Sequence, residues 1–297
     1  IAGLRYHDEE LDLGAPSNPI LLNLQPLVLP EISETVTIEA WLPKVALEYT
    51  PTDDLMFFAQ YATGARNGNI NSQGTLGAME LFAPGSSEGF GSYDEDSVEA
   101  YELGMKSTLW DGRATFNASL FYTDYTDLQV LVAQPPLGFA LIVNASEASS
   151  TGFEAEFSAA LSDNLTLFAG GNYTKAELEE DLLTSVLTGD VTPSGTPLPN
   201  IPEWTANAGL EYTAPAFGTT DWYLNGSWAY TGEYETSLGA GSQTLGDFSV
   251  FNAGLGLRSD AWSLDLLVTN LTDEAEVVAS NNFDPVITQQ GLELPPG

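Results

Sequence analysis

Apolar and polar residues alternate along ten segments of the chain, and a period of two is the period of a β-strand. In the segment from Arg113 to Tyr122, Phe116 and Leu120 fall on one side of the predicted strand. Arg113 and Asn117 fall on the other side. The pattern predicts strands over 41–49, 55–63, 101–109, 113–122, 153–161, 165–173, 204–212, 222–230, 251–258 and 262–270. The opening residues IAGLRY add an eleventh strand, so we expect an all-β, antiparallel up-and-down sheet.

The charged residues inside these ten segments all share the parity of the polar side. They are Lys44, Glu48, Glu102, Lys106, Arg113, Glu154, Glu156, Glu211, Arg258 and Asp265. A charge that faces lipid at the midplane of a bilayer costs about 2–4 kcal/mol in a β-barrel. The exclusion of charge from one side therefore indicates a transmembrane β-barrel wall, with lipid on its apolar side and water on its polar side.

The connections between the predicted strands alternate between short and long. The short ones are rich in Asp, Asn, Gly, Pro and Ser, which form turns, and cover 50–54, 110–112, 162–164, 214–220 and 259–261. The long ones cover roughly 8–40, 64–97, 126–152, 174–202, 232–247 and everything after 271, and almost nothing in them has helical periodicity. Outer-membrane barrels have this asymmetry, with short periplasmic turns and long extracellular loops.

Tyrosine and tryptophan lie near the ends of the predicted strands, on the apolar side. Trp204 and Tyr212 are eight residues apart, as are Trp222 and Tyr230. Eight residues span about 26 Å of strand, which in a tilted barrel strand covers about 20 Å of membrane height. We therefore expect aromatic girdles built from Tyr49, Tyr61, Tyr101, Trp110, Tyr122, Tyr173, Trp204, Tyr212, Trp222, Tyr230 and Trp262.

The composition is strongly acidic, with 7 Lys and Arg against 42 Asp and Glu and a formal net charge of −35. This argues against nucleic acid as a partner, because binding to phosphates requires a basic face. The acidic runs at 7–10, 93–96 and 176–181 fall between strands, and we interpret them as solvated loops. Capture of a divalent cation is the alternative, although no run has the twelve-residue calcium-loop pattern. The lack of cysteine excludes a disulfide scaffold and a thiolate metal site.

Neither end of the chain has the features of a complete membrane protein. No run of 18 apolar residues predicts a transmembrane helix, and the chain begins without a basic and apolar leader. Bacterial single-chain barrels have an even number of strands, whereas eleven leave one unpaired. We therefore expect truncation at both ends, with unpaired strands near Ile1 and near Asn270.

Five stretches, in chain order, resemble barrel segments of TonB-dependent outer-membrane receptors. They are LPKVALEYTPTDDLMFFAQYATGARNGNIN (42–71), YELGMKSTLWDGRATFNASLFYTDYTDLQV (101–130), NASEASSTGFEAEFSAALSDNLTLFAGGNYTKAEL (144–178), NIPEWTANAGLEY (200–212) and LLVTNLTDEAE (266–276). The resemblance implies a barrel of 22 strands around an N-terminal plug domain. It also implies uptake of a scarce ligand, such as a ferric siderophore, cobalamin or a carbohydrate, with energy from TonB.

The chain departs from that family pattern in three ways. It has no plug, no TonB-contacting segment near its start and no last strand that ends in an aromatic residue. We interpret 1–297 as one partial barrel domain of a bacterial outer membrane, unable to carry out energised transport without the plug. The partners implied are outer-membrane lipid and lipopolysaccharide, the TonB complex through the missing N-terminal part, and a small-molecule ligand of unknown identity.

Candidates for catalytic chemistry are few. His7 is the single histidine and reads as a solvated strand-end residue, which excludes histidine-pair metal sites and Ser-His-Asp triads as usual designs. Glu154 and Glu156 share the inner face and would suit acid–base work, but we interpret them as groups that hydrate the lumen and pair with Lys106 or Arg113. Residues 68–71 lie between strands without a following helix and form no phosphate loop. We expect no enzyme activity, no cofactor and no resident metal.

Two sets of residues are candidate sites. The set expected to face the lumen or a plug is Arg5, Lys44, Lys106, Arg113, Glu154, Glu156 and Arg258. The set expected to contact ligand lies on the long connections, because rigid scaffolds commonly carry recognition on loops. It consists of Arg66, Asn67, Phe90, Tyr93, Tyr125, Phe139 and Tyr234, and packing of the loops on themselves is the alternative role for each.

Three other classes of protein make different predictions. A passive, porin-like barrel of ten to twelve strands requires pairing between the first and the last strand. An outer-membrane hydrolase requires a catalytic cluster that a chain with one histidine supports poorly. A soluble β-sandwich predicts long loops at both ends of the strands. The porin-like channel is the main alternative to a receptor.

Overall fold

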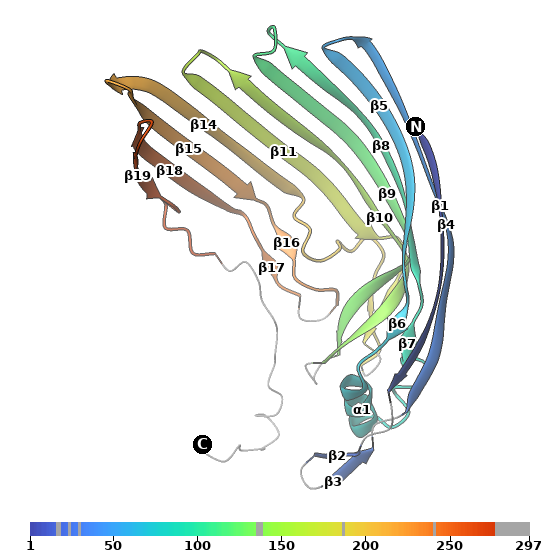
Figure 1. Cartoon of the computed structure of the whole chain (residues 1–297). Coiled ribbons are helices and arrows are strands. Elements are labelled where there is room, and N and C mark those ends of the chain that lie inside the picture. Colours follow the sequence, from blue (N-terminus) through green and yellow to red (C-terminus); the bar gives the residue numbers. More distant parts are fainter. Residues whose placement is uncertain are drawn as a thin grey trace, which may run out of the picture.

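The computed structural model describes residues 1–15, 19–22, 25–28, 31–134, 139–185, 188–239 and 242–276. One antiparallel sheet of 11 strands dominates it and curves into an open wall (Figure 1). In sheet order, its strands are β1 (Ala2–Ala15), β4 (Ile32–Thr52), β5 (Leu55–Arg66), β8 (Asp96–Leu109), β9 (Ala114–Gln134), β10 (Phe139–Ala160), β11 (Leu165–Leu178), β14 (Trp204–Phe217), β15 (Thr220–Thr231), β18 (Phe248–Arg258) and β19 (Ser263–Val268).

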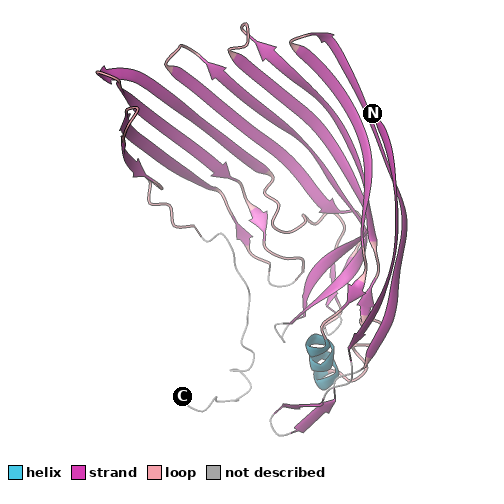
Figure 2. Ribbon diagram, in the orientation of Figure 1, coloured by secondary structure: helices cyan, strands magenta, loops and turns pink. Residues whose placement is uncertain are grey.

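Small elements lie in the connections at one end of this wall (Figure 2). Four two-stranded sheets pair β2 (Pro19–Leu22) with β3 (Gln25–Val28), β6 (Asn69–Ile70) with β7 (Ser92–Tyr93), β12 (Leu182–Ser185) with β13 (Asp190–Thr192), and β16 (Tyr234–Glu235) with β17 (Thr244–Leu245). The helix α1 (Gln73–Phe82) lies between β6 and β7. Among the described residues, no helix is long and apolar enough to cross a bilayer.

All eleven predicted strands are confirmed, in the predicted order. Each strand of the large sheet pairs with the large-sheet strands that come before and after it in the chain, which is the up-and-down arrangement. Within the described residues, β1 pairs only with β4 and β19 pairs only with β18. The unpaired strands expected near Ile1 and Asn270 are therefore present as the two edges of the sheet.

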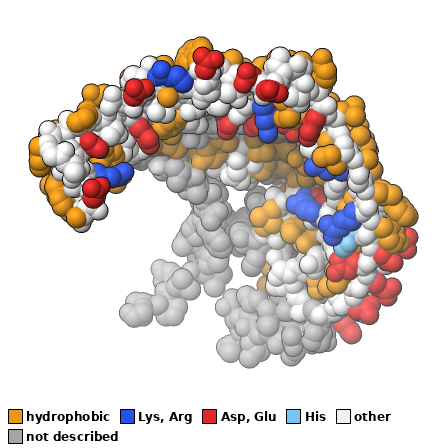
Figure 3. Space-filling model, turned by 45° about the horizontal axis from the view of Figure 1, so that its top comes forward, with side chains coloured by type: hydrophobic (Ala, Val, Ile, Leu, Met, Phe, Trp, Pro, Cys, Tyr) orange, Lys and Arg blue, Asp and Glu red, His pale blue; other side chains and the backbone are white. Residues whose placement is uncertain are grey.

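The pairing register places the predicted polar parity on one face throughout the wall. Glu156 lies opposite Asn117, which in turn lies opposite Lys106. On the other face, Leu120 lies opposite Leu103, and both are more than half exposed. Figure 3 shows hydrophobic side chains along the convex side of the wall and several basic side chains on its concave side. A continuous exposed apolar face of this kind requires an apolar environment.

Aromatic rings on the concave face lie over glycines of the next strand. Phe58, Phe121, Phe168 and Tyr223 each stand directly opposite a glycine, and a Cβ on that glycine would collide with the ring. The pairs are Phe58 with Gly104, Phe121 with Gly152, Phe168 with Gly209, and Tyr223 with Gly256. This contact explains why large aromatic residues occur at polar-side positions of the pattern.

The sequence pattern underestimated the far ends of several strands and missed the helix. β4 begins at Ile32 rather than 41, and β9 continues to Gln134 rather than 122. The expectation of an irregular connection over 64–97, with no helix after 68–71, was wrong because α1 begins at Gln73. Ser72 gives α1 no side-chain cap, whereas Leu76 and Met79 are fully buried. Tertiary packing therefore holds this helix, as it does most short helices.

Candidate functional site

A small hydrophobic core closes over the concave side of the wall at the end where the long connections gather. The far ends of β9 and β10 bend towards the concave side and approach α1 and the β12–β13 hairpin (Figure 1). We call this cluster the mouth core. Its buried members are Leu76, Met79, Leu128, Val130, Val132, Leu141, Ala145, Ala148, Ala176, Leu178, Leu182, Leu198 and Leu238. Burial of so many apolar groups away from water stabilises the inward fold without help from a membrane.

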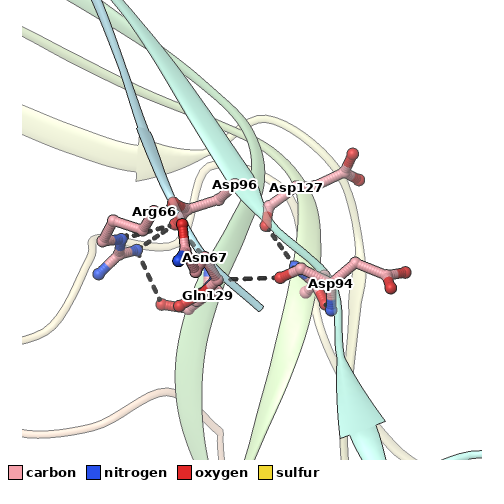
Figure 4. A network of polar contacts seen from close by, with 7 residues as sticks. Arg66, Asn67, Asp94, Asp96, Asp127 and Gln129 are labelled. Atoms are coloured by element: carbon pink, nitrogen blue, oxygen red, sulfur yellow. Dashed lines mark hydrogen bonds and ion pairs between the residues drawn. The ribbon is translucent and has the colours of Figure 1, made fainter. Parts of the chain in front are cut away.

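A second set of contacts, the mouth network, ties this fold to the wall (Figure 4). The carboxylate of Asp96 is only 6% exposed and accepts hydrogen bonds from Arg66 Nε at 2.9 Å and from the backbone N–H of Gln129 at 3.1 Å. The hydrogen bond to Asp96 raises the pKa of the Arg66 guanidinium above its ordinary value. Because Arg66 ends β5, Asp96 begins β8 and Gln129 lies in β9, these contacts join three strands.

Side-chain amides complete the mouth network. Gln129 Nε2 donates to the backbone carbonyls of Asn67 and Asp94, at 3.0 Å each. Asn144 Nδ2 donates to the carbonyls of Asp94 at 3.1 Å and Asp127 at 2.7 Å, while its Oδ1 accepts from the Asp94 N–H at 2.8 Å. The carboxylates of Asp94 and Asp127 point away from these contacts (Figure 4). The amides therefore lock the backbone and leave two anionic groups directed outward.

The ligand-contact candidates fall into three environments. Arg66 and Asn67 belong to the mouth network, and Asn67 Nδ2 also donates to Glu9 Oε2 at 2.5 Å. Phe90 and Tyr125 pack against the mouth core. Tyr93 in β7 and Tyr234 in β16 are half-buried. The side chain of Phe139 lies outside the described residues. Direct contact between these residues and a ligand stays a prediction.

Asp96, Gln129 and Asn144 were absent from the sequence-based candidates. Asp96 belongs to the acidic run 93–96, which was interpreted as a solvated loop, yet it is buried against Arg66. Arg66 was the available signal, because a cation 30 residues away can neutralise a buried acid only if the chain returns to it. The amides of Gln129 and Asn144 give no sequence signal of this kind.

The candidate lumen residues share the concave face with a shallow hollow of about 440 Å³ in the wall. We call it the inner hollow, and its polar lining includes Glu48, Glu102, Lys106, Asn117, Glu154 and Glu156. The pairing register places Arg5, Lys44, Arg113 and Arg258 on the same face. Contact between this face and a plug stays a prediction.

The expected ion pairs of Glu154 and Glu156 with Lys106 or Arg113 are wrong for the described structure. Glu154 Oε1 accepts a hydrogen bond from Ser119 Oγ at 3.2 Å, whereas Arg113 Nε donates to the Ala160 carbonyl at 3.1 Å. The Lys106 ammonium lies 5.9 Å from the centre of the Phe58 ring. Asn117 stands between Glu156 and Lys106 in the register, so about 10 Å separates their strands, and no ion pair joins these two described residues.

The histidine also differs from expectation. His7 lies in the middle of β1, not at a strand end, and its ring is partly covered. Its Nε2 lies 3.3 Å from Glu9 Oε2 on the same face of the strand. The strand is longer than predicted because β1 continues through the acidic run to Ala15. Among the described residues, no group of three or more histidine, aspartate and glutamate side chains is arranged to hold a metal.

The girdle candidates form two bands on the convex face, separated by the length of the wall strands. Near the long connections, rings contact one another across strands, with centroid distances of 5.0 Å for Tyr61 and Tyr101, 6.2 Å for Tyr101 and Tyr122, and 4.9 Å for Tyr173 and Trp204. Tyr230 also lies at this end, whereas the candidates near the short turns are Tyr49, Trp110, Tyr212, Trp222 and Trp262. An apolar convex face between aromatic bands, with polar groups inside, defines a wall of an outer-membrane β-barrel.

Comparisons with known proteins agree with this class. The family model described as TonB dependent receptor-like, beta-barrel matches residues 1–271. The chain therefore belongs to the family of TonB-dependent receptors, which are located in the Gram-negative outer membrane.

Two curated relatives and one solved structure show how far the similarity extends. The chain is 32% identical over 184 residues to the ferric-pyoverdine M114 receptor PbuA of Pseudomonas sp. strain M114, covering 59% of this chain and 21% of that protein. It is 28% identical over 153 residues to the metal-pseudopaline receptor CntO of Pseudomonas aeruginosa, covering 51% and 19%. The copper transporter OprC superposes with a TM-score of 0.67 at 16% identity, covering 93% of this chain and 40% of that one. The matched regions amount to about a fifth of each curated relative.

Proposed function

We propose that the receptor containing this chain takes up a scarce ligand across the outer membrane, with energy from TonB. The observation that carries this proposal is the mouth core, a packed and polar-locked structure held over the concave side of a barrel wall. An ordered mouth of this kind suits selective binding, because concave, preformed sites bind small molecules with little ordering cost.

The sequence resemblance implies a ferric siderophore, cobalamin or a carbohydrate as the ligand. The names of the similar proteins favour a ligand that contains a metal. The names of PbuA, CntO and OprC refer to ferric pyoverdine, metal pseudopaline and copper. The three ligands differ, so the proposal for this chain extends to a metal or metal complex and no further. Transport, rather than catalysis, is the role proposed.

We also propose how the domain works within the whole receptor. Residues 1–297 form part of the barrel, the concave face contacts a plug, and TonB binds a segment N-terminal to this wall. Lipid and lipopolysaccharide cover the convex face. The polar lining of the inner hollow supports the plug contact, since a wet lumen or a polar domain satisfies those groups.

The receptor proposal is tested in bacteria that produce this protein. The gene is deleted, and cellular iron, copper, zinc and cobalt are measured by mass spectrometry during growth with a chelator. We expect a selective fall in one metal, restored by the intact gene and matched by loss of TonB. An unchanged metal content would contradict metal uptake. A fall that is independent of TonB would favour the passive channel, although β1 and β19 share no pairing and this sheet alone encloses no pore.

A further inference from the structure

The positive charges of the chain are distributed unevenly. Of its 7 lysine and arginine residues, five lie on the wall, and only Arg66 and Lys175 lie at the mouth. Each mouth cation is neutralised, Arg66 by Asp96 and Lys175 by Glu177, whose Oε1 lies 2.5 Å from Nζ. The segments outside the described residues contain no lysine or arginine. The mouth therefore offers no uncompensated basic side chain, while its acidic side chains attract cations.

A pocket of about 540 Å³ opens at this acidic mouth, between the β12–β13 hairpin and the β16–β17 connection. We call it the mouth pocket. No basic side chain lines it, and its oxygen-bearing lining residues are Thr184, Asp190, Thr192, Thr196, Glu235, Ser237 and Ser242. Its size is in the range of small-molecule sites, and its polar groups can accept hydrogen bonds from a cationic ligand.

The mouth pocket is preformed because its walls are anchored in the mouth core. Leu182 and Leu238 are buried, and Leu238 forms a β-bridge with Val132 beside the pocket-lining Ser237. Within the β12–β13 wall of the pocket, Thr192 Oγ1 donates to Thr184 Oγ1 at 3.1 Å. These contacts fix the lining before any ligand binds, which reduces the entropy cost of binding.

Glu235 is held as an oriented anion. Its Oε1 accepts from Thr244 Oγ1 at 2.7 Å, and its Oε2 accepts from Ser242 Oγ. These hydroxyl donors lower the pKa of Glu235 below its ordinary value, so the side chain is ionised at neutral pH. A carboxylate has about four acceptor positions, and two hydroxyl donors leave capacity for a third partner.

We propose that the mouth pocket binds a protonated amine of the imported ligand. Glu235 and Asp190 supply the negative charge, and the threonine and serine oxygens accept the remaining N–H groups. An anionic group is disfavoured because no lining residue carries a positive charge. A bare metal ion is disfavoured because no three acidic or histidine groups converge among the described residues. This inference rests on the proposed uptake function and adds one chemical feature to the ligand.

The test uses the complete receptor, purified in detergent, with spermidine as the probe. Isothermal titration calorimetry measures its affinity for the wild type, Glu235→Gln and the control Glu88→Gln. Glu88 is exposed and lies outside the mouth pocket, so its substitution makes the same change in net charge elsewhere. We expect Glu235→Gln to weaken binding at least tenfold and Glu88→Gln to leave it within twofold. No binding to the wild type, or equal weakening by both variants, overturns the proposal.

A second variant covers the case in which Glu235→Gln disturbs the loop. Ser237→Lys places an ammonium group of the protein itself in the pocket, and spermidine binding should be lost while the heat-dependent gel mobility of the folded barrel is kept. Metal uptake by the same variants separates the two proposals. Weakened spermidine binding with normal uptake refutes the role of the pocket in ligand recognition and leaves TonB-dependent uptake intact. Loss of uptake together with spermidine binding supports both.

Discussion

At the scale of single residues, the mouth depends on a few carboxylates whose donors are fixed in space. Asp96 is buried and receives donors from two strands, and Glu80 receives donors from the chain that follows α1. Both occur in a chain whose acids mostly face water. What distinguishes them is geometry, because each lies where backbone N–H groups and a side-chain donor converge.

Removing the charge of Asp96 should loosen the mouth. In Asp96→Asn, the Arg66 guanidinium loses its anion and the Gln129 N–H loses a charged acceptor. The Arg66 side chain is 58% exposed, so water screens part of the loss, and we expect about 1–3 kcal/mol of local destabilisation. Hydrogen exchange at the Gln129 amide should become faster. Asp53→Asn, at an exposed turn, serves as the control, and equal exchange in both variants would contradict the role of Asp96.

Glu80 should make the segment after α1 sensitive to acid. Its carboxylate accepts from the Gly85 N–H at 2.9 Å and from Ser87 Oγ at 2.6 Å, and these donors lower its pKa in the folded state. Because the pKa is lowered in the folded state, the ionised carboxylate of Glu80 stabilises the segment fully above the ordinary pKa of 4.5. This stabilisation is lost as pH falls through the pKa of the folded state. The protection of the Gly85 and Ser87 amides, measured as the exchange rate relative to the intrinsic rate at each pH, should therefore fall below about pH 4.5. In Glu80→Gln this protection should already be low at neutral pH, and a pH profile of protection in that variant that matches the wild type would refute the assignment.

At the scale of elements, the strands are defined by the contrast between their two faces. Val45 and Ala46 illustrate it, because they are neighbours in β4 on opposite faces. Val45 lies on the convex face midway between Trp41 and Tyr49, and Ala46 lines the inner hollow. The same substitution therefore enters two different solvents at almost the same membrane depth.

An arginine at each position should give unequal effects. Val45→Arg places a charge against lipid and should cost about 2–4 kcal/mol, whereas Ala46→Arg enters a hollow with four carboxylates and should cost much less. Denaturant titration of receptor refolded into lipid measures both changes. Equal destabilisation by the two variants would show that the convex face is not the lipid face.

The glycines beneath aromatic rings should resist substitution. Gly104→Ala would drive a Cβ into the Phe58 ring, and overpacking of this type costs about 1–3 kcal/mol. Gly3→Ala is the matched control, because a Cβ there meets nothing within 4 Å. Shortening the ring in Phe58→Ala together with Gly104→Ala should recover part of the loss. A double variant as unstable as the sum of both single variants would contradict a direct clash.

At the scale of the whole molecule, the wall and the mouth obey different rules. The wall separates two solvents, so a period of two in the sequence was sufficient to predict its strands, their order, the edges and the face of the ten charged residues inside the predicted segments. The mouth is a small globular core with apolar groups on several elements. There, β9 continues past its predicted end, and Leu128, Val130 and Val132 are buried in the mouth core. Leu76 and Met79 are the buried residues of α1, a helix too short to produce a clear period in the sequence. The partners of Arg66 also depend on chain segments that meet only after folding.

The lack of cysteine allows a direct test of which face meets a plug. A single cysteine in place of Glu156, on the concave face, should crosslink to the plug in the intact receptor through a short bifunctional reagent. A cysteine in place of Val45, on the convex face, should not. Crosslinking is read as a shift of the fragments on a gel after proteolysis. No crosslink from Glu156 or from other concave positions would exclude contact between this face and a plug.

The rings over glycines also bear on how such a wall aligns its strands correctly. A slip of two residues between neighbouring strands keeps every side chain on its proper face, so amphipathic alternation cannot prevent it. Short turns fix the alignment of the ladders that they close. Of the four ladders joined by long connections, the three that β5–β8, β11–β14 and β15–β18 form each contain one ring-on-glycine pair, with the ring on the earlier strand, and the β9–β10 ladder, whose strands are linked by residues 135–138, contains a fourth. A two-residue slip in either direction would place the ring of Phe58, Phe121 or Phe168 against a side chain, whereas Tyr223 would meet Arg258 in one direction and Gly254 in the other. The three phenylalanine pairs therefore each accept one alignment, and two of them, in β5–β8 and β11–β14, do so where the loop imposes none.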